Sequence, residues 1–248
     1  ITEMIHTASL VHDDVVDEAG TRRGVPTVHS RFNSRVAVLA GDFLFAQASW
    51  HLANLDDLEV VKLLSRVIMD LAEGEIRQGL YRYDTGQSLD TYLEKSYWKT
   101  ASLMANSSRA AGVLSGIDAT QLQALHDFGR LLGLAFQVVD DILDFIGDDD
   151  QLGKPAASDL ASGTLTAPVI YAMASQPALA GLIEREFRDA GDLEQALELV
   201  HQSDGIARSR TLAEGFARQA GECLAFLPPS PSRQALLRLP DFVLSRLY

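Results

Sequence analysis

Residues 118–146 read DATQLQALHDFGRLLGLAFQVVDDILDFI, and this stretch decides the fold class of the chain. Asp118 followed by Gln121 matches a capping box, the pair of side chains that opens many helices. No proline interrupts the stretch, and it lacks the two-residue alternation of apolar and polar residues that marks a strand. The sequence therefore predicts one long helix that ends near Ile146.

The same features extend outward from this helix. Residues 27–154 contain no proline, and most glycines among them separate stretches of helical periodicity. Further long helices are predicted over residues 34–55, 57–83 and 88–114. The first of them places apolar residues at three- and four-residue steps, namely Val36, Leu39, Phe43, Ala46 and Trp50. Strands are not expected anywhere, so the predicted fold class is all-α, one domain built from long helices.

The composition is that of a globular protein with an acidic surface. Of 248 residues, 47% are hydrophobic and 22% charged, and 34 acidic residues against 21 basic ones give a net charge of −13. This balance excludes a general nucleic-acid binder, which needs a basic face. Cys223 is the only cysteine, so the chain has no internal disulfide and fits a reducing compartment. We expect a bacterial cytoplasmic protein or one of an organelle stroma, and not a secreted protein.

Two clusters of acidic residues break the amphipathic pattern in the same way. Residues 13–17 and residues 140–144 both read D-D-x-x-D, and both lie in apolar surroundings. Residues four apart lie about 40° apart around a helix, so the first and last aspartate of each cluster share a face. Buried carboxylates without a positive partner are costly, and Mg²⁺ prefers oxygen ligands. The candidate metal ligands are therefore Asp13, Asp14, Asp17, Asp140, Asp141 and Asp144.

A single D-D-x-x-D is more often a solvated helix face, but two copies in apolar surroundings favour metal binding. Other phosphate-binding devices are absent from the sequence: it contains neither a P-loop nor a G-x-G dinucleotide turn. Basic residues are few, yet several are near the clusters or at helical spacing. These are Arg22 and Arg23 after the first cluster, Lys95 and Lys99 four residues apart, and Lys154 after the second cluster. Together they indicate a polyanionic ligand such as a diphosphate.

These motifs resemble those of the trans-isoprenyl (polyprenyl) diphosphate synthases, and most of all the long-chain solanesyl-type members. Residues 13–24 read D-D-x-x-D-x-x-x-x-R-R-G, and the second D-D-x-x-D follows in the expected order with residues 41–45, 99–100, 137 and 152–155. The resemblance covers essentially the whole chain. It implies one isoprenoid synthase domain over residues 1–248, a single bundle of long antiparallel helices around a deep central cavity, and usually a homodimer.

The resemblance also assigns roles to individual residues. The two aspartate motifs are expected to hold about three Mg²⁺ ions on an allylic diphosphate. The catalytic positions around this diphosphate match Lys99, Thr100, Gln137 and Lys154, and Arg22 matches a further ligand of it. Arg23 matches a ligand of isopentenyl diphosphate. The implied activity is Mg²⁺-dependent condensation of the two diphosphates, and the expected membrane contact is at most transient.

The sequence departs from the family pattern in two places. The family's helices upstream of the first motif, which bind isopentenyl diphosphate, are absent from these 248 residues. Many members also carry a second lysine ten residues after the position of Lys154, where this chain has Thr164. The affinity for diphosphate would then be weaker, unless another cation substitutes.

Product length and two alternative functions complete the expectations. Residues N-terminal to Asp13 would line the wall of the cavity, and Ala8 and Ser9 are small where short-chain members carry aromatic residues, with Ile5 next on that face. The family resemblance therefore implies a long-chain all-trans polyprenyl diphosphate of about eight to ten isoprene units. A chain growing from the first motif would pass Ser9 and Ala8 after one turn of the helix, about 5 Å along. A terpene cyclase usually replaces the second motif, and a non-catalytic partner subunit commonly loses one motif. This chain keeps both motifs, although both alternatives share the fold.

Overall fold

The computed structural model describes residues 1–147 and 157–247, and long helices dominate this part of the chain. The helices of the first half are α1 (Thr2–Val16), α2 (Val28–Arg31), α3 (Ser34–Ala53), α4 (Leu58–Leu80), α5 (Leu89–Ser96), α6 (Ser102–Leu114) and α7 (Ala119–Ile146). The second half contains α9 (Ser158–Ala161), α10 (Ala167–Ser175), α11 (Ala178–Glu184), α12 (Asp192–Gln202), α13 (Gly205–Cys223) and α14 (Pro231–Ser245). A short 3-10 turn, η2 (Leu224–Phe226), follows α13. The predicted all-α class is confirmed.

The predicted caps begin the predicted helices. The Asp118 carboxylate accepts a hydrogen bond from the Gln121 backbone amide, and the Asp118 backbone amide donates one to the Gln121 side-chain oxygen, which completes the capping box of α7. Asp57 accepts a hydrogen bond from the Val60 amide at the start of α4. Such caps each stabilise a helix by about 1 kcal/mol because they satisfy amides that have no partner within the helix.

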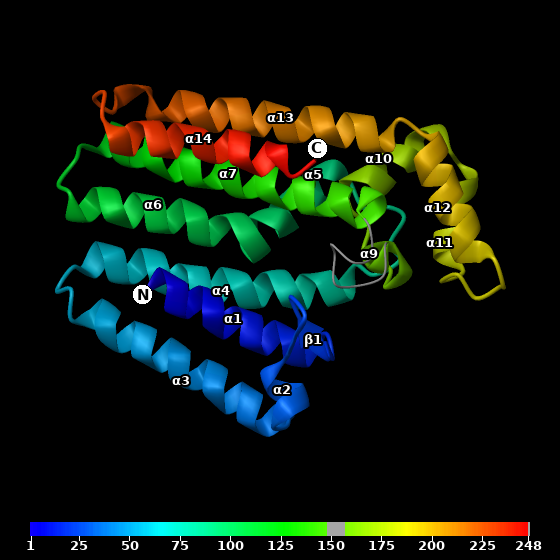
Figure 1. The fold of residues 1–248 in the computed structure, drawn as a ribbon, viewed down its shortest axis with the longest axis horizontal. Helices are drawn as coiled ribbons and strands as arrows, with labels where there is room; N and C mark the ends of the chain where they lie inside the picture. The colour runs from blue at the N-terminus through cyan, green and yellow to red at the C-terminus, as the bar shows by residue number, and fades with distance from the viewer. Residues whose placement is uncertain (148–156, 248) are drawn as a thin grey trace.

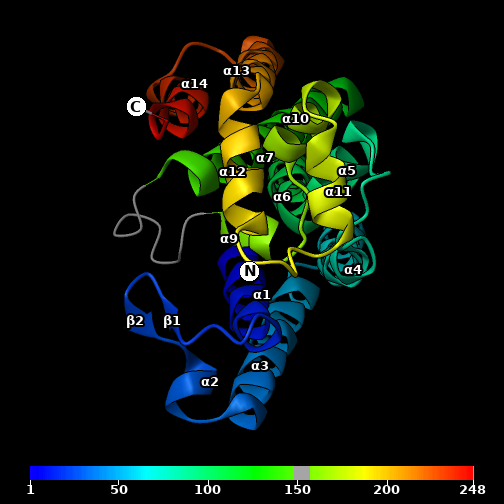
Figure 2. The ribbon, with the colours of Figure 1, turned by 90° about the vertical axis from the view of Figure 1, so that its right-hand side faces the viewer.

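The long helices run side by side, as Figure 1 shows, and α11 and α12 lie at one end of the molecule. Helix α7 packs against α6 and α13, and α1 packs against α3. The view from that end shows α7 among α5, α6, α10 and α13, with α1, α3 and the β-hairpin on the opposite side (Figure 2). One apolar cluster surrounds α7, and another joins α1, α3, α4 and α6. The fold thus brings the ends of α1 and α7, which carry the acidic motifs, to the same region.

Two local features differ from the sequence prediction. Strands β1 (Thr21–Arg22) and β2 (Val25–Pro26) form a small antiparallel hairpin, so the expectation of no strands was wrong for these residues. Arg23 and Gly24 both have positive φ, as a two-residue hairpin turn of type I′ requires. The helix predicted over residues 88–114 is interrupted by a π-helical turn, η1 (Tyr97–Ala101), between α5 and α6.

The apolar stripe of α3 also points outward. Val36, Leu39, Phe43 and Trp50 are 41–66% exposed, whereas the small residues Ala37, Gly41 and Ala48 face the neighbouring helices. Among the described residues, α3 is the one helix whose length and mean hydropathy would let it cross a membrane. In this fold it packs along α1 with one face and exposes the other.

Candidate functional site

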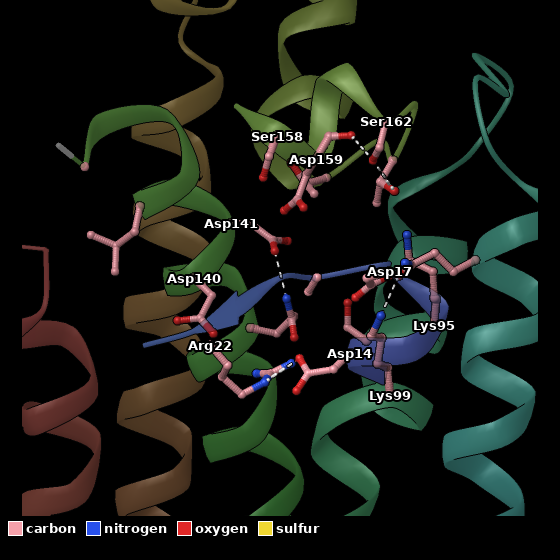
Figure 3. Close-up of a pocket in the computed structure, with 18 of the residues that line it drawn as sticks. Asp14, Asp17, Arg22, Lys95, Lys99, Asp140, Asp141, Ser158, Asp159 and Ser162 are labelled. Atoms are coloured by element: carbon pink, nitrogen blue, oxygen red, sulfur yellow. Dashed lines mark hydrogen bonds and ion pairs between the residues drawn. The ribbon is translucent and has the colours of Figure 1, made fainter. Parts of the chain in front are cut away.

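A cleft of about 1040 Å³ lies where α1, α5 and α7 end and the β-hairpin begins. Helix α1 contributes Asp14 and Asp17, and α7 contributes Asp140 and Asp141. Figure 3 shows the aspartates of α1 and those of α7 on different walls of this cleft, with Lys95 and Lys99 on the side nearest Asp17. Both acidic motifs therefore supply side chains to one space.

The first motif lies at the end of α1. Asp14 is 5% exposed, and its Oδ1 accepts a hydrogen bond of 2.8 Å from Nε of Arg22 on β1. Asp17 is the C-cap residue of α1 and is exposed. Burial raises the pKa of Asp13 to about 6, although the charge of Lys99 opposes the shift. Asp13 is not among the described residues that line the cleft.

Asp141 of the second motif is held from two sides. Its side chain is buried, and the Tyr92 hydroxyl donates a hydrogen bond of 2.5 Å to Oδ2. Nε2 of Gln137 donates one of 2.8 Å to Oδ1. Burial raises the pKa of Asp141 to about 7, and the negative charge of Asp159 adds to the shift, while the two hydrogen bonds oppose it. The carboxylate of Asp141 is thus held in one orientation, and its pKa lies near neutral pH.

The two other aspartates of the second motif have different surroundings. Oδ1 of Asp140 lies 2.7 Å from Nη2 of Arg246, whose guanidinium stacks 4.7 Å above the Phe136 ring. Asp144 is 1% exposed and accepts hydrogen bonds of 3.1 Å from the Ser158 hydroxyl and from the Asp159 amide. Asp144 is therefore tied to the start of α9 and does not line the cleft.

The π-helical turn η1 carries Lys99 and Thr100. Nζ of Lys99 lies 2.8 Å from Oε2 of Glu75 and donates to Oε1 of Gln78 at 3.1 Å. The Thr100 hydroxyl donates a hydrogen bond of 2.6 Å to Oε1 of Gln137, the residue that in turn holds Asp141. Thr100 thus acts on the cleft through Gln137 and does not line it.

Glycine allows the π turn to pack between its neighbours. A Cβ at Gly133 of α7 would lie 2.5 Å from Cα of Ala101, and one at Gly74 of α4 would lie 3.1 Å from the Lys99 amide nitrogen. Helix α7 therefore approaches the backbone of η1 more closely at Gly133 than any larger residue would permit, and at Gly74 a larger residue would require a small shift of η1. π turns recur at functional sites, and this one sets the position of Lys99.

The carboxylate oxygens of the cleft suit a Mg²⁺ ion that is shared with a substrate phosphate. The acidic side chains of the cleft offer only carboxylate oxygens, the ligands that this ion prefers. Among the described residues, no group of three acidic, His or Cys side chains is close enough to hold a metal ion alone. Mg²⁺ usually binds through one or two carboxylates, with water and substrate phosphate as the remaining ligands. The cleft fits that mode of binding and not a closed protein cage.

Comparisons with known proteins agree with this geometry. The family model described as polyprenyl synthetase matches residues 1–200. The chain belongs to the polyprenyl synthetase family. It is 65% identical over 248 residues to a prenyl transferase of Synechocystis sp., covering 100% of this chain and 77% of that protein. It is 52% identical over 247 residues to the chloroplastic solanesyl-diphosphate synthase 2 of Oryza sativa, covering 100% of this chain and 61% of that protein.

Solved structures of the family have the same fold. A decaprenyl diphosphate synthase from Rhodobacter capsulatus superposes with a TM-score of 0.92 at 36% identity, covering 100% of this chain and 78% of that one. A heptaprenyl diphosphate synthase from Staphylococcus aureus gives a TM-score of 0.94 at 32% identity, covering 98% and 77%. The isoprenoid synthase fold expected from the motifs is confirmed.

Not all residues that the family resemblance pointed to lie at the cleft. Arg22, Arg23, Lys99 and Gln137 line it, together with four of the six aspartates. Lys154 lies outside the described residues. Ile5 and Ala8 are fully buried and Ser9 is half-buried, and none of the three lines this cleft. Their role as the wall of a product cavity stays a prediction for this polyprenyl synthetase.

Three residues contribute to the cleft of this family member although the sequence analysis assigned them no role in it. Tyr92 holds Asp141, and Arg246 pairs with Asp140 from the far end of the chain. Lys95, noted only for its spacing from Lys99, is 7% exposed and lines the cleft, and burial lowers the pKa of its ammonium. Tyr92 precedes Lys99 by about two helical turns and Lys95 precedes it by about one. This spacing places the three side chains on one face of a helix, and it could have indicated that Tyr92 and Lys95 lie near the site of Lys99.

Proposed function

We propose that this chain is a Mg²⁺-dependent trans-polyprenyl diphosphate synthase, which extends an allylic diphosphate with successive units of isopentenyl diphosphate. The observation that carries the proposal is the meeting of two acidic motifs with Arg22, Lys99 and Gln137 at one cleft. Carboxylates that can share metal ions with a phosphate, beside cationic side chains, form a site for a diphosphate. The prenyl transferase and solanesyl synthase names of the relatives support the same activity.

The chemistry explains why these residue types are needed. The allylic carbon–oxygen bond breaks, and the diphosphate leaves with the electron pair. The double bond of isopentenyl diphosphate attacks the resulting carbocation, a carbon–carbon bond forms, and the adjacent carbon loses a proton to the departing diphosphate. Charge therefore develops on the leaving group, where preorganised cations stabilise it. Lys99 and Arg22 are the described side chains that we assign to this task.

The six aspartates of the two motifs would hold the metal ions, namely Asp13, Asp14, Asp17, Asp140, Asp141 and Asp144. Bound Mg²⁺ supplies positive charge that stabilises the diphosphate as a leaving group. Tyr92 and Gln137 orient Asp141 for this purpose, and Thr100 orients Gln137. Arg22, now paired with Asp14, is long enough to turn toward a bound phosphate. Arg23 would contact isopentenyl diphosphate.

The similar proteins also support an assignment of product length and cellular location. Solanesyl, decaprenyl and heptaprenyl diphosphate synthases are among the similar proteins, so we assign a long-chain product. Such a product is very apolar and requires transient membrane contact for release. Because relatives include cyanobacterial and chloroplastic proteins, we place the enzyme in a bacterial cytoplasm or an organelle stroma.

We assign a homodimer whose interface includes the outer face of α3. Val36, Leu39, Phe43 and Trp50 form this exposed face at heptad-like spacing. A continuous apolar stripe on a helix of an otherwise acidic protein is the kind of surface that a partner covers. A second copy offers the same stripe, so the contact can be self-complementary.

The proposed activity can be tested in two steps. The protein is first titrated with an unreactive thio analogue of farnesyl diphosphate, with Mg²⁺ and then with excess chelator. It is next incubated with farnesyl or geranylgeranyl diphosphate, labelled isopentenyl diphosphate and Mg²⁺, and the products are separated by length. We expect Mg²⁺-dependent binding and a ladder of long products. Binding without any condensation would favour a non-catalytic partner subunit, and cyclic hydrocarbons would favour a terpene cyclase.

A further inference from the structure

Lys95 on α5 is a buried lysine whose charge has no ionic partner among the described residues. Its side chain is 7% exposed, and it lines the cleft. No carboxylate in the described ranges lies within ion-pair distance of its Nζ, and the nearest recorded contact is the Tyr92 ring, whose centroid is 5.9 Å away. A desolvated ammonium without an ion pair is costly to keep. Such a group is expected where a ligand supplies the missing negative charge.

Lys99, one helical turn further on, is in a different situation. Its Nζ is already engaged by Glu75 at 2.8 Å and by Gln78 at 3.1 Å. The two lysines are four residues apart and approach the same cleft, so their charges repel each other. Of the two lysines, Lys99 is paired with a protein carboxylate, whereas Lys95 has no carboxylate within ion-pair distance in the described ranges, and the charges of Asp141 and Asp159 act on it only from farther away. Lys95 is therefore the lysine of the cleft whose ammonium can pair with an anion without first giving up a carboxylate.

Thr164 lies at the same cleft and carries no charge. Its amide donates a hydrogen bond of 2.8 Å to the Asp159 carbonyl, and its hydroxyl lies 3.4 Å from the Ser162 hydroxyl. Residues 157–166, the described part of this loop, contain no lysine or arginine, so they bring no cation to this wall of the cleft. Helix α10, which follows the loop, packs against α5, the helix that carries Lys95. The two positions therefore face one space from adjoining elements.

We infer that the Lys95 ammonium is a ligand of the allylic diphosphate and supplies from α5 the positive charge that Thr164 does not provide. The inference rests on the proposed function, because it names a further contact at the same diphosphate site. The ammonium is a compact point charge that can donate to several phosphate oxygens, as a diphosphate requires. Lys95 would thereby help to hold the substrate before the reaction and the diphosphate product after it.

The test removes the positive charge at position 95 on α5 and places one at position 164, on the other wall of the cleft. Lys95→Met removes the ammonium, Thr164→Lys places one at the other position, and the double variant carries only the second. Lys62→Met, on the exposed side of α4, is the matched control. For each protein the Kd of inorganic diphosphate is measured with saturating Mg²⁺, and the KM of farnesyl diphosphate and of isopentenyl diphosphate is measured in the elongation assay.

We expect Lys95→Met to raise the Kd of diphosphate and the KM of farnesyl diphosphate about 10- to 100-fold, as the loss of a charge-assisted contact predicts. The melting temperature without ligand should not fall, because an unpaired buried charge is removed. Adding Thr164→Lys to Lys95→Met should restore most of the affinity. The KM of isopentenyl diphosphate should stay unchanged.

Three results would overturn the inference while leaving the proposed function intact. These are an unchanged diphosphate affinity in Lys95→Met, an effect confined to isopentenyl diphosphate, and a double variant no better than the single one. Failure of the unmodified protein to bind diphosphate with Mg²⁺ would instead count against the proposed function itself. The two failures are therefore distinguishable in one set of measurements.

Discussion

The Tyr92 hydroxyl donates a hydrogen bond of 2.5 Å to Oδ2 of Asp141, and both side chains are buried. Gln137 occupies the other carboxylate oxygen of Asp141 at 2.8 Å. The carboxylate is thus fixed in orientation from two helices, α5 and α7. An aspartate that must bind a metal ion benefits from such second contacts, which commonly change metal affinity about 10- to 100-fold.

Tyr92→Phe is therefore expected to raise the Mg²⁺ concentration that gives half-maximal activity about tenfold. The ring still fills its place in the core, so the fold should persist and saturating Mg²⁺ should restore most of kcat. Activity measured as a function of Mg²⁺ concentration checks this. Tyr81→Phe, outside the cleft, is the matched control. An equal loss at all Mg²⁺ concentrations would show that Tyr92 does not act through Asp141.

The pKa of Asp141 predicts how pH affects the metal-free protein. Burial, aided by the charge of Asp159, raises this pKa from 3.8 to about 7. Between these values the folded protein binds more protons than the unfolded chain, so its free energy of unfolding falls as pH rises toward 7. Mg²⁺ binds the deprotonated carboxylate and should reverse the loss. We expect Mg²⁺ with diphosphate to raise the melting temperature more at about pH 8 than at about pH 6.

Metal binding by this group should also release a proton. If one proton is displaced, the affinity for Mg²⁺ falls about tenfold for each pH unit below the pKa of about 7. Calorimetry in two buffers of different ionisation enthalpy would measure the release. Mg²⁺ affinity that is constant between about pH 5 and about pH 8 would contradict this account.

The helices were predictable from the sequence because their signals are local. The capping box at Asp118 and the cap at Asp57 each involve residues three apart, and both begin a helix as expected. The D-D-x-x-D motifs indicated the aspartates of the cleft for the same reason. Spacing within a helix fixes which side chains share a face, whatever the rest of the chain does.

The remaining features depend on contacts between distant parts of the chain. Tyr92 meets Asp141 across 49 residues, and Arg246 reaches Asp140 from the C-cap of α14. The apolar stripe of α3 has the periodicity of a core face, yet it is exposed because small residues form the face toward α1. Asp144 accepts hydrogen bonds from the Ser158 hydroxyl and the Asp159 amide, contacts that its spacing in the motif does not predict. Local patterns do not specify which neighbour a face will meet.

The close packing of Gly133 against η1 predicts that a larger residue at this position would displace the π turn. A Cβ at this position would lie 2.5 Å from Cα of Ala101, so Gly133→Ala must displace the backbone of η1 and with it Lys99. We expect a loss of about 1–3 kcal/mol in the free energy of unfolding, as for other overpacked cores, and a raised KM for the allylic diphosphate. Urea unfolding and steady-state kinetics check both. Gly79→Ala, which meets no neighbouring atom, should be neutral or slightly stabilising.

The exposed face of α3 predicts the oligomeric state. Phe43 is 61% exposed in the middle of the stripe, so Phe43→Glu would place a charge against its copy in a dimer. We expect the molar mass measured by light scattering to fall to that of one chain at concentrations where the unmodified protein is dimeric. Met69→Glu, at an exposed position on α4, serves as a comparison away from the stripe. A monomeric unmodified protein would contradict the proposed interface.

The last prediction concerns product length and uses the half-buried residue on α1. Ser9 precedes Asp13 by four residues, about one helical turn, and its hydroxyl donates to the His6 carbonyl at 2.9 Å. Ala8 and Ile5 are fully buried, so a larger side chain there would overpack the core. Ser9 is therefore the position where an aromatic ring can block a growing chain without unfolding the helix.

We expect Ser9→Phe to shorten the product to about the length of farnesyl or geranylgeranyl diphosphate, about three or four isoprene units, because the ring meets the chain about 5 Å beyond the first motif. The first condensations should keep most of their rate, since the diphosphate site is unchanged. Thr7→Phe, exposed on the same helix, controls for a general effect of a new aromatic side chain. Chromatography of the labelled products from both variants decides the matter. If Ser9→Phe gives the same ladder as Thr7→Phe, the growing chain does not run along α1.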